Sequence, residues 1–172
     1  LNFPRLDLQK RMTVIEEGIT RIFAMQMPDG SIGYWPRNRL TSVLNSTFNG
    51  GQPSTGHPWC SAYAGLLIAL IEKDADPRIA TLVPAESAGR LREYLKTWLT
   101  KPSSAELAAS YSGQALAAYA LALAGKPETA AHERLFDSAQ LLGVDDRALL
   151  AMAIHLSGGL EKSVRALLDS SA

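Results

Sequence analysis

The sequence has a single cysteine, Cys60, among 172 residues. One thiol excludes a disulfide framework within the chain and a cysteine-rich zinc site, because both need several cysteines. The three histidines, His57, His132 and His155, lie far apart, and no pair has the spacing of a metal-binding motif. We therefore expect no metal site and no cofactor in this chain.

The sequence also lacks an excess of charge of either sign, since 17 basic residues balance 17 acidic ones. A balanced chain has no electrostatic footprint for nucleic acid. Its longest apolar run, residues 62–71, falls far short of the ~20 residues that a membrane-spanning helix needs. We expect no nucleic-acid partner and no direct insertion into a membrane.

The chain does have an alternation of two kinds of helical segment. Segments that are apolar on all sides (57–71, 112–124 and 147–156) alternate with segments that are apolar on one face (8–25, 85–99, 128–142 and 161–168). A helix without a polar face must be covered all round, whereas a one-faced helix lies between core and water. The pattern predicts an all-α single domain over residues 1–172, with seven helices alternating outer and inner and almost no strand.

The order of the helices has a consequence for the ends of the array. Stacked helix pairs leave an apolar face open at each end unless something caps it. The chain therefore either closes on itself or forms part of a larger ring. The spacing of the pairs also fits a solenoid of helical hairpins, and the periodicity alone does not separate these possibilities.

Two segments resemble the thioester-containing domain of bacterial alpha-2-macroglobulins. In that family a helix ends in a Gln-x-x-Asp-Gly-x-x-Gly-Tyr-Trp turn, and a short Gly-rich link leads to a Trp-x-x-Ala-Tyr helix. Here Gln26-Met-Pro-Asp-Gly-Ser-Ile-Gly-Tyr-Trp35 precedes Trp59-Cys-Ser-Ala-Tyr63, and residues 117–127 and 146–156 resemble later parts of the domain. The resemblance implies a partial α/α toroid, of which this chain is the later part.

The resemblance also implies a function. The family's proteins are large secreted or periplasmic inhibitors that trap the protease that cuts their bait region, and many form a covalent thioester link to it. This chain would then have a structural and interaction role without catalysis. Its partners would be neighbouring domains of the same protein and, through the full-length protein, target proteases. Its location would be periplasmic or extracellular, although residues 1–5 show no signal segment.

The chain departs from the family pattern in two places. It has no Cys-x-Glu-Gln thioester motif, and Cys60 is followed by Ser61-Ala62-Tyr63, so it cannot form the thioester. The parent protein therefore carries the motif upstream or lacks it. The segment from Arg37 to Gly56 is also longer than the family's usual link.

We expect no catalytic residues, because the best carboxylate pair, Asp145-Asp146, is explained more simply as a helix cap. The candidate binding residues are Tyr34, Trp35, His57 and Trp59. With Tyr63, these aromatic side chains could line a carbohydrate groove, but a packed cluster that pins the turn to the inner helix is the simpler interpretation. Two alternatives stay open, a toroidal enzyme acting on polysaccharide or isoprenoid and a helical-repeat scaffold that binds a protein.

Overall fold

The computed structural model describes residues 7–34, 56–100 and 111–169. Within these ranges the protein is all-α, and the one sheet-like feature is an isolated antiparallel bridge between Gln26 and Ile32. The described helices are α1 (Leu8–Ala24), α3 (Pro58–Glu72), α4 (Pro77–Ala80), α5 (Ala85–Thr100), α7 (Tyr111–Leu123), α8 (Thr129–Asp137), α9 (Val144–Leu156) and α10 (Glu161–Asp169), with a 3₁₀ turn at Ala139–Leu141.

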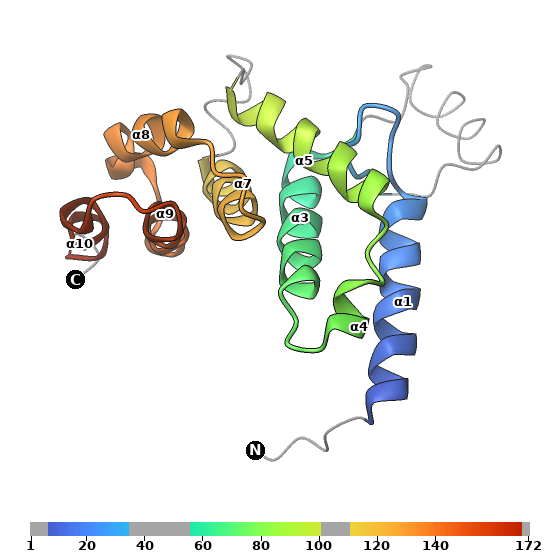
Figure 1. Ribbon diagram of the computed structural model, residues 1–172. Coiled ribbons are helices and arrows are strands. Elements are labelled where there is room, and N and C mark those ends of the chain that lie inside the picture. The colour runs from blue at the N-terminus through green and yellow to red at the C-terminus, as the bar shows by residue number, and fades with distance from the viewer. Residues whose placement is uncertain (1–6, 35–55, 101–110, 170–172) are drawn as a thin grey trace, which may run out of the picture.

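The three apolar helices form an inner row. Helix α7 packs between α3 on one side and α9 on the other (Figure 1). Small residues bring α3 close to its neighbours: a Cβ added to Gly65 of α3 would lie 3.7 Å from Ala120 Cβ of α7 and 2.7 Å from Leu95 Cδ1 of the outer helix α5. Helix α7 is therefore buried on nearly all sides, as its composition predicts.

The one-faced helices cover this row from outside. Ile19 of α1 packs with Ile68 of α3 and Ala88 of α5, so α1 and α5 both cover α3. Helices α8 and α10 pack against α9. The predicted alternation of outer and inner helices is confirmed, and the chain has a toroid-like all-α fold. None of the described helices has the length and apolar character needed to cross a bilayer.

Three local expectations differ from the structure. The connector after α3 contains an unpredicted four-residue helix, α4, which begins at Pro77 and is capped by Asp76. The predicted helix 128–142 ends at Asp137 because Leu142 adopts an extended backbone and enters the core. The sequence from Ser31 to Trp35 favours a short extended segment, but its described residues, 31–34, form only the single bridge already described.

The expected N-cap at Asp145-Asp146 is also wrong in register. Helix α9 begins at Val144, its N-cap is Gly143, and both aspartates lie in the first turn. There the Asp146 carboxylate accepts the backbone N–H of Gly143 at 3.3 Å. Negative charge at this end also interacts favourably with the helix dipole. Asp146 thus stabilises the start of α9 from inside the helix.

Candidate functional site

The turn between α1 and α3 is tied to α5 by the side chain of Gln26. Its Nε2 donates to the carbonyl oxygens of Gly30 at 3.1 Å and Ser87 at 2.9 Å. Its Oε1 accepts a hydrogen bond from Arg90 Nη2 at 2.9 Å. A glutamine suits this position because it supplies two donors and an acceptor from one buried group. Gln26 therefore acts as a bracket between the turn and an outer helix.

The glycine of the same turn is required by its backbone conformation and by its neighbour. Gly30 has φ +92°, a region that side-chain-bearing residues rarely adopt. A Cβ at this position would lie 2.2 Å from the backbone oxygen of Arg90. Beside it, the Asp29 carboxylate accepts hydrogen bonds from the backbone N–H of Ser31 at 3.0 Å and from its hydroxyl at 2.6 Å. The Asp-Gly pair thus shapes a tight turn that contacts α5.

A second set of hydrogen bonds joins the turn to the start of α3. The N–H of Ile32 donates to Ser61 Oγ at 2.8 Å, and Ser61 Oγ donates to the backbone oxygen of His57 at 2.9 Å. The N–H of His57 donates to the backbone oxygen of Ile32 at 2.8 Å. Ser61 is fully buried, so its hydroxyl satisfies groups that water does not reach. The two segments that carry the family resemblance are therefore built against each other.

The aromatic side chains next to this junction form what we call the aromatic surface: Tyr34, His57, Trp59 and Tyr63. The ring of Tyr34 lies 4.8 Å from that of His57, at an angle of 52°. Trp59 is stacked on Tyr63 with ring centroids 5.5 Å apart, and both side chains are about half exposed. The structure thus pairs Tyr34 with His57 and Trp59 with Tyr63. Trp35 and residues 37–55 of the long segment lie outside the described residues.

The lone thiol belongs to this surface. Removal of water from the Tyr34 hydroxyl, together with its hydrogen bond to the Cys60 side chain, raises the pKa of Tyr34 above its ordinary value. Cys60 is half-buried and is not part of a disulfide. The Nδ1 atom of His57 is buried and has no hydrogen-bond partner among the described residues.

The inner row leaves apolar side chains exposed at both of its ends. On α3, Trp59, Tyr63 and Leu70 share the face opposite the buried one, because their spacing returns to the same side of a helix. At the other end of the row, the exposed apolar residues are Val144, Met152 and Leu156 on α9, with Leu160 and Leu168 in and before α10. These uncovered faces belong to the helices at the two ends of the row.

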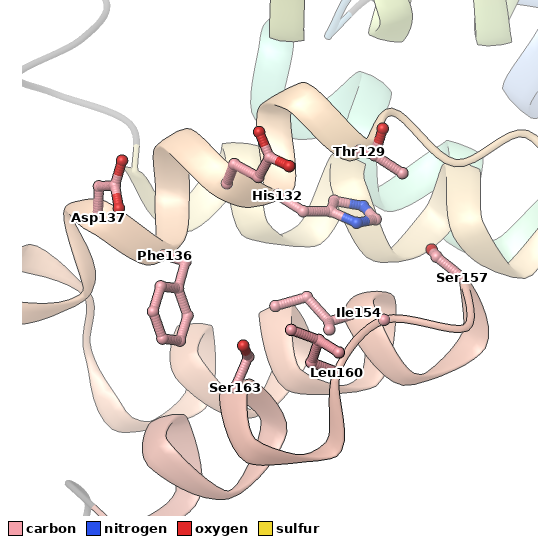
Figure 2. A pocket seen from close by; sticks show the side chains of 10 residues that line it. Thr129, His132, Phe136, Asp137, Ile154, Ser157, Leu160 and Ser163 are labelled. Carbon is pink, nitrogen blue, oxygen red and sulfur yellow. The ribbon is translucent and has the colours of Figure 1, made fainter.

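A pocket of about 280 Å³ lies between α8 and the α9–α10 hairpin (Figure 2). His132 and Phe136 project into it from α8, and Ile154 and Leu160 line the facing side. Its complete lining is Thr129, His132, Glu133, Phe136, Asp137, Ile154, Ser157, Gly159, Leu160 and Ser163. The α8 members recur at helical spacing and form one face of that helix.

His132 is the buried polar group of this pocket, with 5% of its surface exposed. Burial lowers its pKa below the ordinary value, against the opposing effects of Glu128 and of a hydrogen bond to the backbone of Ala118. Its Nε2 atom has no hydrogen-bond partner among the described residues. In the sequence, His132 is only one of three scattered histidines. The one-faced character of the 128–142 segment is the signal that could point to it.

The described residues contain no group of three or more His, Cys, Asp or Glu side chains that could hold a metal ion. His132, Glu133 and Asp137 line one pocket but do not converge as metal ligands. The pocket is therefore lined by two carboxylates and several hydroxyls around an apolar wall.

The fold defines a class of protein, the toroid-like helical domains in which inner and outer helices alternate. Among solved structures, the fold is similar to that of a part of Escherichia coli alpha-2-macroglobulin. The crystal structure of its native form, spanning domain MG7 to the C-terminus, matches with a TM-score of 0.71 and 18% identity over 94% of this chain. The cryo-EM reconstruction of the native conformation gives 0.71, and the trypsin-activated crystal structure gives 0.70, both at 18% identity.

The chain covers 23%, 9% and 10% of those three structures, respectively. No protein-family model and no curated protein matches the sequence. The comparisons therefore establish the fold of this chain. They bear out the likeness to bacterial alpha-2-macroglobulins indicated by the Gln26–Trp35 turn and the Trp59–Tyr63 helix.

Proposed function

We propose that this chain is part of the toroidal domain of an alpha-2-macroglobulin-like protein that traps proteases. The observation that carries the proposal is the fold match over 94% of the chain. The described part of the motif turn, Gln26–Tyr34, and the Trp59–Tyr63 segment of α3 form one hydrogen-bonded junction in this fold.

The role within such a protein is structural and not enzymatic. The motif residues Gln26, Gly30 and Ser61 hold α3 to its neighbours through buried hydrogen bonds and close packing. The match is equally good to the native form, at 0.71, and to the trypsin-activated form, at 0.70. A unit that keeps its internal packing in both forms would move as a body against neighbouring domains.

The toroid is proposed to be larger than residues 1–172. The exposed apolar faces of α3 and α9 support this, because large apolar patches on a helix row mark surfaces that another element covers. Further helix pairs of the same protein would pack there. The thioester residues, if the parent has them, would lie in that remaining part.

The partners and location follow from the same proposal. Target proteases would meet the full-length protein, and this chain would contact neighbouring domains of its own protein. The protein would act in the periplasm or outside the cell. The balanced net charge agrees with a domain that binds other domains and not nucleic acid.

The parent protein tests the function directly. It is mixed with trypsin, and cleavage of a small chromogenic peptide is compared with cleavage of a large protein substrate. A trap leaves the peptide activity and removes most of the protein-cleaving activity. Equal retention or equal loss of both activities would contradict the proposal.

The dependence on this domain is tested with two variants of the parent protein. Gly30→Val, which breaks the turn, should abolish trapping, whereas Gly18→Ala should leave it unchanged because nothing lies within 4 Å of a Cβ at that position. Reading the parent sequence upstream for Cys-x-Glu-Gln then decides whether trapping is covalent.

A further inference from the structure

The three inner helices repeat one pattern from their first residue onward. Helices α3, α7 and α9 begin at Pro58, Tyr111 and Val144, and their sequences align from these residues without a gap. Helices α7 and α9 also have the same length, 13 residues. The alignment places one buried position in all three helices, at Ile68, Leu121 and Ile154. Each inner helix can therefore be compared with the next, position by position.

One side of each inner helix faces the next helix of the row. On α3 this side is marked by Gly65, where an added Cβ would lie 3.7 Å from Ala120 Cβ of α7. Ala62 and Ala69 lie on the same side, because residues three and four apart share one face of a helix, and both are buried. The equivalent residues of α7, which packs on α9, are also buried: Ala115 and Ala122. In α3 and α7 this side is thus closed by the next inner helix.

The same side of α9 is open. The equivalent residues are Ala148, which is only partly buried, and His155, which is exposed. Val144, one turn before Ala148 on this side, is 55% exposed. Ala151 stays buried, as expected next to an outer helix, since Gly65 of α3 also lies against α5. No described inner helix closes the side formed by Val144, Ala148 and His155, which we call the open side of α9.

The outer helices end in the same way. Helix α5 packs on both α3 and α7, and α8 packs on both α7 and α9 (Figure 1). Within the described ranges, α10 packs substantially on α9 alone. Leu167 of α10 is buried, whereas Leu168, on the adjoining part of its apolar face, is about half exposed. The outer helices α5 and α8 each bridge two inner helices, but α10 has one such neighbour among the described residues.

We propose that another inner helix of the same protein packs on the open side of α9 and against α10. It continues the contacts that join α3 to α7 and α7 to α9, so it is apolar on all sides and has a small residue opposite Ala148. It also has a hydrogen-bonding side chain within reach of His155, because an imidazole that is removed from water needs a partner. The proposal rests on the larger toroid proposed above and does not depend on protease trapping.

The first test compares His155 in the parent protein and in the 172-residue chain, diluted until the chain is monomeric. Exchange of the imidazole C2 hydrogen for deuterium, followed by mass spectrometry, reports how well water reaches each ring and needs no substitution. We expect His155 to exchange at least about fivefold more slowly in the parent, because the additional helix covers it. His132, already 5% exposed in this chain, is the internal control and should exchange at similar rates in both proteins. Equal rates for His155 would overturn the proposal.

The second test identifies what covers the open side. The parent protein is produced with photo-methionine, which changes the side chain little, and is crosslinked by light. Met152 is 42% exposed and lies one turn from Ala148 on α9. We expect it to crosslink to a segment of the same molecule, outside residues 1–172, that is apolar on all sides and contains a hydrogen-bonding residue. Met27, 5% exposed, is the control and should crosslink only within residues 1–172.

The two tests separate this inference from the proposed function. A crosslink from Met152 to a second copy, to another protein or to a one-faced or strand-forming segment contradicts the inference, and so does the absence of any crosslink from Met152. The trypsin assay reports protease trapping independently. Failure of trapping with the expected crosslink would reject the proposed function and keep the inference, whereas trapping with an unprotected His155 would reject the inference alone.

Discussion

The buried polar side chains of the turn before α3 and of the pocket beside α8 differ in how completely they are hydrogen-bonded. In the turn, the side chain of Gln26 makes three hydrogen bonds: two with residues of α5 and one with a residue of the turn itself. In the pocket, His132 leaves Nε2 without a partner among the described residues. A satisfied polar network fixes a conformation, whereas a buried polar group without a hydrogen-bond partner lowers stability. The segment with the more specific sequence motif is thus part of the scaffold.

The largest expected effect is on the turn. Gly30→Ala should lower the free energy of unfolding by about 3 kcal/mol, because it combines a strained positive φ with a contact of 2.2 Å to the Arg90 oxygen. The measurement is chemical denaturation followed by circular dichroism. The matched control is Gly18→Ala in α1, where a Cβ meets nothing within 4 Å and helix propensity should add stability. Equal effects at the two glycines would remove the special role of the turn.

A smaller loss of stability is expected when the side chain of Gln26 is removed. Gln26→Ala should cost about 2 kcal/mol, because it leaves the buried carbonyl of Gly30, the partly buried carbonyl of Ser87 and the Arg90 guanidinium without their partner. The same substitution at Gln140, which is exposed in the 3₁₀ turn, should change stability little. Hydrogen exchange in α5 should rise for Gln26→Ala and not for Gln140→Ala. If Gln26→Ala costs no more than Gln140→Ala, the bracket does not hold the turn.

At the pocket, the contribution of His132 to the free energy of unfolding should depend on pH. The folded-state pKa of His132 is lowered, so the unfolded chain binds a proton more readily. Its contribution to stability is therefore constant above about pH 6.5 and is lost as the pH falls below that value, with a slope of at most about 1.4 kcal/mol per pH unit. Urea unfolding between pH 7.5 and 5 measures it. His132→Gln should flatten the curve, and His155→Gln, at an exposed position, should not.

Much of the fold could be predicted from the sequence, because helix type follows from the distribution of apolar residues. Segments such as 57–71 and 112–124 have no polar face and must be inner, and the structure places them so. The boundaries failed where a tertiary contact overrides helical periodicity. Leu142 leaves the helical conformation to enter the core, and Pro77 with its Asp76 cap starts a short helix inside a connector.

The site was less predictable. The sequence brought out Tyr34, His57 and Trp59 as aromatic side chains near a turn, and the structure places them at the start of α3. It could not show that Gln26 and Ser61 would connect three elements, because their partners lie up to 64 residues away. Nor could it show the pocket at His132, since its walls come from three helices and the missing partner of Nε2 is visible only after packing.

The central claim is that the inner row presents uncovered apolar faces on α3 and α9 that other helices of a larger toroid would cover. Sedimentation velocity of the 172-residue chain over a range of concentrations tests it most directly. We expect concentration-dependent association, which the combined substitutions Tyr63→Gln and Leu156→Gln reduce without loss of helicity, because both side chains are about half exposed. A monodisperse monomer at all concentrations, unaffected by these substitutions, would contradict it.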